Sequence, residues 1–448
     1  MDASRLGSRI RDVLRQNGTH PAGLPAPPPS ASAPDPAATA DALGGALHDA
    51  GGATCVVVER EYPGRGRHGY DRIGECARLA GALVGHLGLL AGREAPPARA
   101  PLLFFDLETT GLSGGAGTHA FLVGCGCFDG DVFRTRQFFL TSYAAEPGLL
   151  RSVADRLEKA GTLVTFNGKT FDLPVIETRF LFHRLAVPGR DLPHLDMLHP
   201  ARRMWRSARA GTADDAMTAD AEADGAPRCT LGALEQAVLG VRRTGDVPGS
   251  EVPARYFHYV RTGQAGPLEP VFEHNRLDLL SLAGLTVRAL RLVDGGVAAA
   301  RSGRECLALG RLYERVGRRD EAATCYDAAA GWPTGGSAEA QSVRIEARRH
   351  LAAICRRARR HADAAALWEA LIEDGACPPA VAREAAEALA IHHEHRSRNL
   401  AAAHAYAQRC LRQAEPQARQ DARRRLARVE RKLAGGSGRN GAAGNLLP

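Results

Sequence analysis

The chain has 448 residues, 44% of them hydrophobic, which is enough for two or three domains and excludes a wholly disordered protein. The net charge of +8 permits an anionic partner without requiring one. No signal-peptide pattern and no window near the ~18 to 20 apolar residues of a membrane span is visible, so we expect a soluble, cytoplasmic protein.

The beginning of the chain predicts little structure and then a short lead-in to a domain. Residues 1–50 are rich in proline and alanine, and we expect them to be disordered. Residues 51–98 follow with a strand that begins at Cys55 and a helix around Glu75 to Leu90.

Residues 99–293 have the pattern of a compact α/β domain. Three strands are expected first, in the segments PLLFFDLETT, HAFLVGCGCF and VFRTRQFFL, and the pair Asp129-Gly130 marks a hairpin turn between the last two. A helix, the short strand TLVTF and a helix over 172–182 come next, and a last helix closes the region near residue 293. This order predicts a mixed sheet of the ribonuclease-H kind, flanked by helices. Residues 207–227 are a low-complexity insertion within the domain.

After residue 300 the sequence predicts helices only. Residues 300–415 resemble two or three tetratricopeptide repeats, with spacings near 40 residues that are longer than the usual repeat of that family. Residues 416–448 are expected to be a basic helix and a flexible tail. The arginine-rich helices are either solvated faces, which we favour slightly, or a surface for nucleic acid or an acidic protein.

Two carboxylates interrupt the first strand of the α/β region. Asp106 and Glu108 are two residues apart, so on a strand they point to the same face. Burying both without compensation is costly, and a divalent cation with hard oxygen ligands would resolve their repulsion. The alternatives are a strand end where both acids reach water and a cap for a following helix.

The residues around these acids resemble a known group of nucleases. The segment DLETTGL is similar to the first motif of the DEDD exonuclease superfamily, which needs two further aspartates. The segment FNGKTFDLP offers Asp172 at a helix start, and EHNRLDLLSL offers His274 and Asp278 one helical turn apart. The histidine branch of that superfamily places its histidine five residues before the aspartate, whereas His274 lies four before, at the position of the tyrosine branch. The role of His274 as general base is therefore less firmly predicted than that of the acids.

Over residues 52–293 the sequence also resembles the bacterial YprB-type ribonuclease-H-like proteins, through segments such as GTHAFLVGCG, CTLGALEQAVLGVRR and DVPGSEVPARYFHYVRTG. The resemblance to the DEDD superfamily implies a 3′–5′ exonuclease that hydrolyses DNA or RNA with two Mg²⁺ or Mn²⁺ ions, and the YprB-type resemblance adds mainly to the expected fold. Asp106, Glu108 and Asp278 would hold one ion, and Asp106 and Asp172 would share in the second, with His274 helping the attacking water. The alternative is an inactive nucleic-acid-binding scaffold that uses its helical repeats for protein partners.

Six further residues are candidate substrate contacts, although loop polar groups are more often solvated. They are Thr109, Thr110, Asn167, Lys169, Arg202 and Arg203. The nearby segment HLDMLHPARR permits a zinc site in principle, but we expect Asp196 to lie near the cleft or to cap the local structure.

Overall fold

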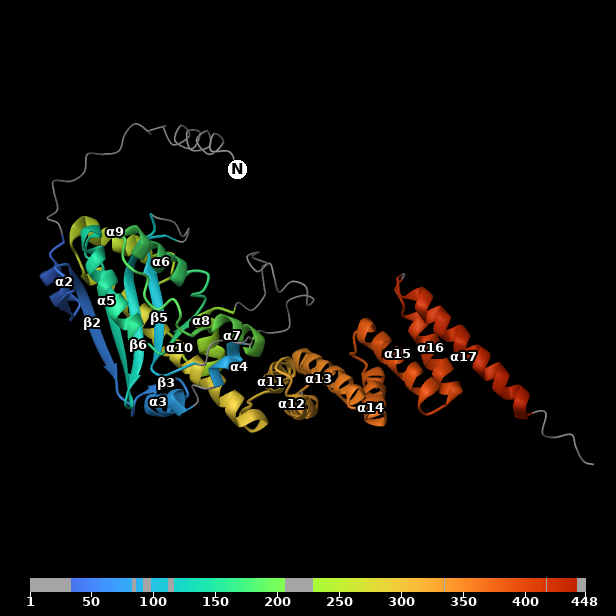
Figure 1. Ribbon diagram of the computed structural model, residues 1–448. Coiled ribbons are helices and arrows are strands. Elements are labelled where there is room, and N and C mark those ends of the chain that lie inside the picture. Colours follow the sequence, from blue (N-terminus) through green and yellow to red (C-terminus); the bar gives the residue numbers. More distant parts are fainter. Residues whose placement is uncertain are drawn as a thin grey trace, which may run out of the picture.

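The structure is a computed structural model of the whole chain. It describes residues 34–82, 86–91, 98–111, 117–205, 229–333, 335–415 and 417–440. An α/β region occupies the first two thirds, and a row of helices extends from it (Figure 1). The expected low-complexity insertion at 207–227, the tail after residue 440 and residues 1–33 lie outside the described residues.

The α/β region is built on a mixed seven-stranded sheet in the order β1-β2-β7-β6-β5-β8-β9. The three predicted consecutive strands are antiparallel neighbours, and β8 and β9 run parallel to β5. The strands are β1 (Ala46–Asp49), β2 (Thr54–Tyr62), β5 (Leu102–Thr109), β6 (Ala120–Asp129), β7 (Val132–Phe139), β8 (Thr162–Thr165) and β9 (His194–Asp196). The expected ribonuclease-H-like mixed sheet is confirmed, and Gly130, with φ +60°, provides the left-handed residue of the β6–β7 turn.

The N-terminal part of the chain is more ordered than its composition predicts. The segment expected to be disordered up to residue 50 contains helix α2 (Pro36–Ala42), capped by the side chain of Asp35, and strand β1. Strand β2 pairs with β7, so residues 51–98 supply part of the main sheet and do not only lead into it. The buried stretch from Cys55 to Val58 explains this pairing, because four consecutive apolar residues need cover on both faces.

Helices cover both faces of the sheet. Phe104 of β5 belongs to an apolar cluster with α10 (Glu269–Gly295), whereas its neighbours Leu103 and Phe105 point the other way, into a cluster with α5 (Glu146–Glu158) and α6 (Asp172–Phe182). The remaining elements are β3 (Arg67–His68), β4 (Asp71–Arg72), α3 (Ile73–Ala82), α4 (Leu87–Ala91), η2 (Tyr143–Ala145), α5 (Glu146–Glu158), α6 (Asp172–Phe182), α7 (Leu198–Trp205), α8 (Leu231–Leu234), η4 (Glu235–Leu239), α9 (Val252–Thr262), η5 (Gly266–Leu268), α10 (Glu269–Gly295) and η6 (Gly296–Ala299). Helix α10 is long enough to cross the sheet and reach the C-terminal helices (Figure 1).

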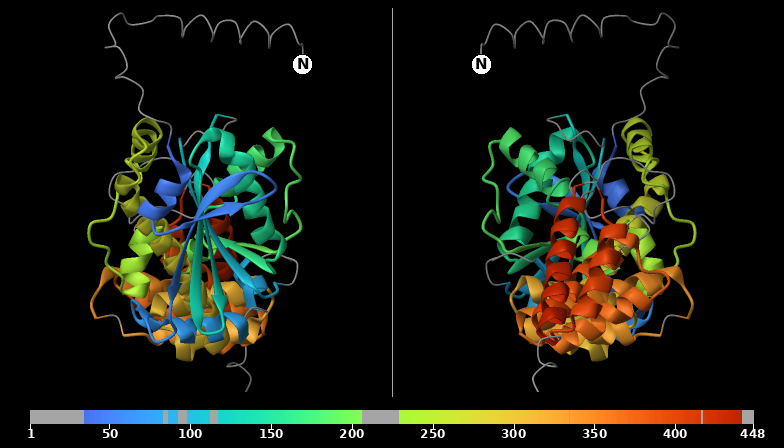
Figure 2. Two further views of the ribbon diagram at one scale, coloured as in Figure 1. Left: turned by 90° about the vertical axis from the view of Figure 1, so that its left-hand side faces the viewer. Right: turned by 90° about the vertical axis from the view of Figure 1, so that its right-hand side faces the viewer.

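Antiparallel helix pairs form the C-terminal region, which is consistent with helical repeats (Figures 1 and 2). They are α11 (Gly303–Arg315), α12 (Arg319–Gly331), α13 (Ala338–Arg357), α14 (His361–Glu373), α15 (Pro379–His395), α16 (Leu400–Arg412) and α17 (Arg419–Asn440). Many arginines of this region pair with acids on the next odd-numbered helix. Three such pairs, each spanning 35 residues, are Arg304–Glu339, Arg311–Glu346 and Arg349–Glu384.

The first helix pair shares its core with the α/β region. Leu285 and Leu292 of α10 belong to the same apolar cluster as Leu309 of α11 and Tyr326 of α12. Glu305 of α11, 5% exposed, adds a polar connection, because it forms an ion pair with the buried Arg288 of α10. No helix within the described ranges has the length and apolar character that crossing a membrane requires, and all ten cysteines are free.

Candidate active site

Asp106 and Glu108 lie on the face of β5 that is covered by α10. Strand alternation puts them on the side of Phe104, which is fully buried, and Leu107 between them points to the opposite face. Both acids are half-buried because they lie toward the end of the strand, beyond its last pairing with β8 at Phe104. The two carboxylates thus lie on one face of the strand, as the sequence predicts.

Four acids are close enough to influence one another. Burial raises the pKa of Asp106 well above its ordinary value, and the negative charges of Asp278, Glu108 and Asp172 raise it further. The four residues come from β5, the start of α6 and the middle of α10. We call Asp106, Glu108, Asp172 and Asp278 the acid cluster.

The pKa values of the other members of the acid cluster are raised as well. Burial, opposed by His274 and assisted by Asp278 and Asp172, raises the pKa of Glu108 to about 8. Burial and the charge of Asp196 raise the pKa of Asp172 to about 7. Near neutral pH such a cluster is only partly ionised unless a cation neutralises it.

Asp172 is the first residue of α6 and is 4% exposed. A backbone hydrogen bond from Leu107 holds its carboxylate next to the two acids of β5. The preceding loop is fixed by the buried Asp196, whose carboxylate accepts hydrogen bonds from the amides of Asn167 (2.8 Å), Lys169 (3.1 Å) and Leu198 (3.1 Å). The expectation that Asp196 has a capping role agrees with these three bonds.

Asp106 is oriented by two buried amides that sequence reasoning did not find. Asn275 donates from Nδ2 to Oδ2 of Asp106 at 2.7 Å, and Gln137 of β7 donates to Oδ1 of Asn275 at 2.8 Å. Gly124 of β6 lies opposite Asp106 and leaves room for this chain, because a Cβ atom there would be 2.3 Å from Oδ1 of Asn275. A glutamine directly before the apolar residues at the end of VFRTRQFFL was the available signal for Gln137.

His274 lies beside Asp278 on α10 and contacts a loop that joins η4 to α9. Its Nε2 atom is 3.6 Å from Oδ2 of Asp278, and its Nδ1 atom is 2.7 Å from Oδ1 of Asp246. Arg243 of the same loop forms ion pairs with Asp278 and with the buried Glu235, and its Nη1 donates to Asp246 at 3.2 Å. Sequence reasoning missed these loop residues, since charged residues in a loop rich in glycine give no spacing that links them to a distant helix.

The carboxylates of the acid cluster are suitable ligands for a hard divalent cation, although the described residues are not arranged around a single ion position. Carboxylate oxygens are the ligands that Mg²⁺ and Mn²⁺ prefer, and the acid cluster supplies them from buried, mutually repelling groups. Among the described residues, no group of three or more histidine, cysteine, aspartate or glutamate side chains is arranged so that it could hold a metal ion. The guanidinium of Arg243 instead supplies positive charge to Asp278.

The predicted substrate contacts next to the acids stabilise the local turns. Thr109 is buried and donates from Oγ1 to the carbonyl of Gly111 at 2.9 Å. The amide of His119 donates to Oγ1 of Thr110 at 3.0 Å. Asn167 has φ +67° and accepts a bond from Thr170, whereas the Lys169 side chain is exposed in the loop before α6. Substrate contact by these four residues stays a prediction.

The two predicted arginines lie on α7, which packs against α4 and α11. Arg203 donates from Nη1 to the carbonyl of Leu90 in α4 at 3.0 Å, and Arg202 is half-buried on the same helix. Arg203 therefore has a structural partner at the junction with the C-terminal helices, and a phosphate-binding role for the pair stays a prediction.

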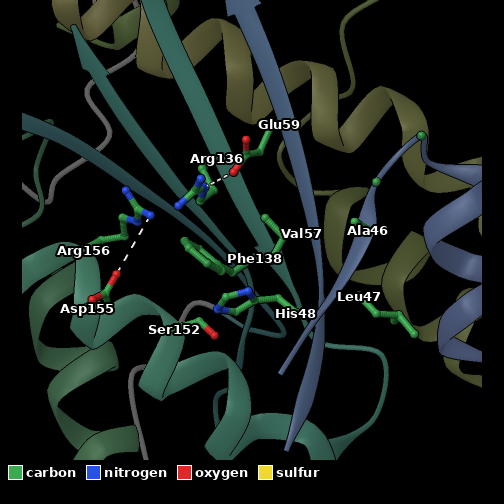
Figure 3. Close-up of a pocket in the computed structure, with 12 residues that line it drawn as sticks. Ala46, Leu47, His48, Val57, Glu59, Arg136, Phe138, Ser152, Asp155 and Arg156 are labelled. Carbon is green, nitrogen blue, oxygen red and sulfur yellow. Dashed lines mark ion pairs between the residues drawn. The ribbon is translucent and has the colours of Figure 1, made fainter. Parts of the chain in front are cut away.

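A pocket of about 470 Å³ is lined by residues of β1, β2, β7 and α5 (Figure 3). Val57 and Phe138, which face each other across β2 and β7, belong to its lining, together with Arg136 and its ion-pair partner Glu59. Phe138 is paired with Val123 of β6, which is paired in turn with Leu107 of β5, so these three side chains lie on one face of the sheet. Leu107 points away from both acids of β5, which therefore lie on the other face. This pocket is therefore separate from the candidate site.

Comparison with known proteins agrees with the fold. Residues 103–290 match the model of the RNase_H superfamily. Over 270 residues the chain is 32% identical to YprB of Bacillus subtilis (strain 168), which is described as an uncharacterized protein. The match covers 60% of this chain and 61% of the relative, which is less than two thirds of the relative's length.

Proposed function

We propose, because residues 103–290 match the RNase_H-superfamily model, that this protein is a metal-dependent nuclease that removes nucleotides from the 3′ end of DNA or RNA. Members of this superfamily are usually hydrolytic nucleases, which commonly use divalent metals. The observation that carries the proposal is the acid cluster, in which burial and mutual repulsion raise the pKa of Asp106 well above its usual range. Crowding four interacting carboxylates, one buried and three half-buried, destabilises a fold, and a functional cation site accounts for this cost.

In this proposal Asp106, Glu108 and Asp278 would hold one divalent cation, and Asp106 and Asp172 would share in a second. When bound, these ions would supply positive charge to the scissile phosphate and the leaving oxygen. Asn275 orients Asp106 through its 2.7 Å hydrogen bond, and the Leu107 amide orients Asp172. The oxygen of water forms a bond to phosphorus, and the bond from phosphorus to the 3′ oxygen breaks. The products are a nucleoside 5′-monophosphate and a chain that is one residue shorter.

A second candidate function is a scaffold that binds nucleic acid without cleaving it. The specific observation in its favour is the ion pair between Arg243 and Asp278, in which an arginine supplies the positive charge. The described residues also include no group of three or more acids, histidines or cysteines arranged to hold a metal ion. The C-terminal helices would then serve mainly to bind a protein partner, as they would for an active enzyme. Ten free cysteines are what we expect of a protein in the reducing cytoplasm, where we place it.

Degradation of 5′-labelled single-stranded DNA and RNA oligonucleotides, with Mn²⁺, with Mg²⁺ and with EDTA, tests the proposal. We expect a metal-dependent ladder that shortens from the 3′ end. Asp106→Asn and Asp278→Asn should each lower the rate by about 10³-fold, since losing a cation ligand removes several kcal/mol of transition-state stabilisation. Asp155→Asn is the matched control, because Asp155 is a half-exposed acid on α5 that pairs with Lys159.

The two candidate functions give opposite results in this experiment. An active wild-type protein whose rate does not respond to EDTA would contradict the metal-dependent mechanism. Binding of either oligonucleotide in EDTA, with no cleavage in any metal, would favour the scaffold.

A further inference from the structure

The loop that carries Asp246 is built to hold this side chain in one place. Gly245 has φ +73°, a conformation that favours glycine, and Val247 is 4% exposed, so the backbone is anchored on both sides of Asp246. The amide of Val247 donates to Oδ1 of Asp246 at 3.0 Å, and Nη1 of Arg243 donates to Oδ2 at 3.2 Å. The carboxylate therefore has little freedom to turn away from His274.

The same contacts determine which nitrogen of His274 carries the proton. Burial alone would raise the pKa of Asp246, but the hydrogen bond and charge of His274 and the charge of Arg243 hold it below its ordinary value. An ionised carboxylate only accepts hydrogen bonds, so at 2.7 Å the Nδ1 atom of His274 must donate. Arg243 is also a donor only, so its 3.4 Å contact with Nδ1 would require the opposite tautomer; the much shorter 2.7 Å bond to the Asp246 carboxylate decides against it.

With the proton on Nδ1, neutral His274 has its lone pair on Nε2. That atom is 3.6 Å from Oδ2 of Asp278, which is longer than a direct hydrogen bond. Nε2 thus faces the acid cluster within ion-pair distance of Asp278. Burial lowers the pKa of His274, but the charges of Asp278, Glu108 and Asp246 raise it above its ordinary value.

From this geometry we propose that Asp246 is a positioning residue, which holds His274 with Nε2 toward the acid cluster as the base for the attacking water. The proposal deepens the proposed nuclease function and rests on it. Nε2 takes one proton from the water whose oxygen bonds to phosphorus, and a solvent proton completes the departing 3′ hydroxyl. His274 lies four residues before Asp278, whereas the histidine branch of the DEDD superfamily places its histidine five before. At this different position, Asp246 from another segment fixes the direction of the ring.

Steady-state kinetics of Asp246→Asn and Asp246→Ala test the catalytic consequence. Asparagine has the same shape, but its amide can donate to Nδ1 and stabilise the opposite tautomer. We expect kcat to fall by about 10²- to 10⁴-fold, the range of a general base. KM should stay within about threefold, since substrate binding does not use this pair. Glu314→Gln is the matched control, because Glu314 contacts Nδ1 of His350 at 3.3 Å in the C-terminal region, away from the acid cluster.

The imidazole ¹⁵N chemical shifts of His274 give a readout that needs neither metal nor substrate. Recorded at a pH above the raised pKa of His274, they distinguish the two neutral tautomers, and the signals are assigned by their loss in His274→Gln. We expect the proton on Nδ1 in the wild type, and a shift of population toward Nε2 in Asp246→Asn.

Each outcome decides the proposal. A wild-type His274 that carries its proton on Nε2 would overturn it, as would an active, folded Asp246→Asn protein with kcat within threefold of wild type. If the wild type cleaves no nucleic acid, the nuclease function fails separately, and the ring signals still show whether Asp246 positions His274.

Discussion

The ion pair between Arg288 and Glu305 is a direct test of how the C-terminal helices are attached. The two side chains are 2% and 6% exposed and connect α10 to α11. Glu305 also accepts hydrogen bonds from the Trp205 indole at 3.0 Å and from the amide of Arg301 at 2.6 Å. Glu305→Gln keeps the volume and an acceptor oxygen but removes the negative charge.

The expected cost follows from the burial of Arg288. Burial lowers the pKa of this guanidinium, and the charge of Glu305 opposes that effect. Without the charge, a buried cation has lost its partner, a change that typically destabilises a protein by about 3 to 5 kcal/mol. We therefore expect Glu305→Gln to lower the free energy of unfolding by about 3 to 5 kcal/mol.

Urea unfolding, followed by circular dichroism and by tryptophan fluorescence, measures this effect, since Trp205 lies at the junction. The double variant Arg288→Met, Glu305→Gln should recover most of the loss, because it no longer buries an unpaired charge. Arg349→Gln is the control for an exposed pair with Glu384 and should cost no more than about 1 kcal/mol. A loss below about 1 kcal/mol in Glu305→Gln, or no recovery in the double variant, would refute the reasoning.

Two further predictions concern the acid cluster. Gly124→Ala should lower the rate of metal-dependent hydrolysis by about 10²-fold, since its Cβ displaces Asn275 and with it the support of Asp106. The increase in Tm on adding Mn²⁺ should grow between pH 6 and pH 8.5. The pKa values of Glu108 and Asp172 are about 8 and about 7, and bound cations require ionised carboxylates. Their raised folded-state pKa values contribute stability at low pH that is lost as the pH rises through 7 to 8, so the metal-free Tm should fall over this window.

Both predictions have simple controls. Gly266→Ala introduces a methyl group into open space and should leave hydrolysis unchanged. A folded Gly124→Ala protein with full activity would show that Asn275 does not support catalysis. Asp172→Asn should flatten the pH dependence of the Mn²⁺ effect, and an Mn²⁺ effect that is independent of pH in the wild type would contradict the assigned shifts.

The parts of the site that local periodicity determines could be predicted from the sequence. Asp106 and Glu108 share a face because strand side chains alternate, and His274 and Asp278 are neighbours because they are one helical turn apart. Asp172 begins its helix at the predicted residue. In the same way, the order of antiparallel strands, helix and parallel strand predicted the sheet.

The parts that depend on tertiary packing could not be predicted. Asp246 meets His274 across 28 residues, and Gln137 meets Asn275 across 138, and no local pattern relates such pairs. Strand β1 was also missed, because its four residues are all exposed and give no apolar alternation. Contacts of this kind are decided by the packing of whole helices and strands against one another.

The arginine–glutamate pairs that join successive odd-numbered helices make the mechanical properties of the C-terminal region dependent on salt. Arg311–Glu346 and Arg349–Glu384 lie at the surface, with side chains 36% to 48% exposed, whereas the Arg288–Glu305 pair at the base is buried. Dissolved ions screen exposed pairs much more than buried ones. High ionic strength should therefore loosen the row of helices between its members while its attachment stays rigid. Salt should then weaken the polar contacts between successive helix pairs, whose apolar cores remain, and should leave the junction with the α/β region unchanged.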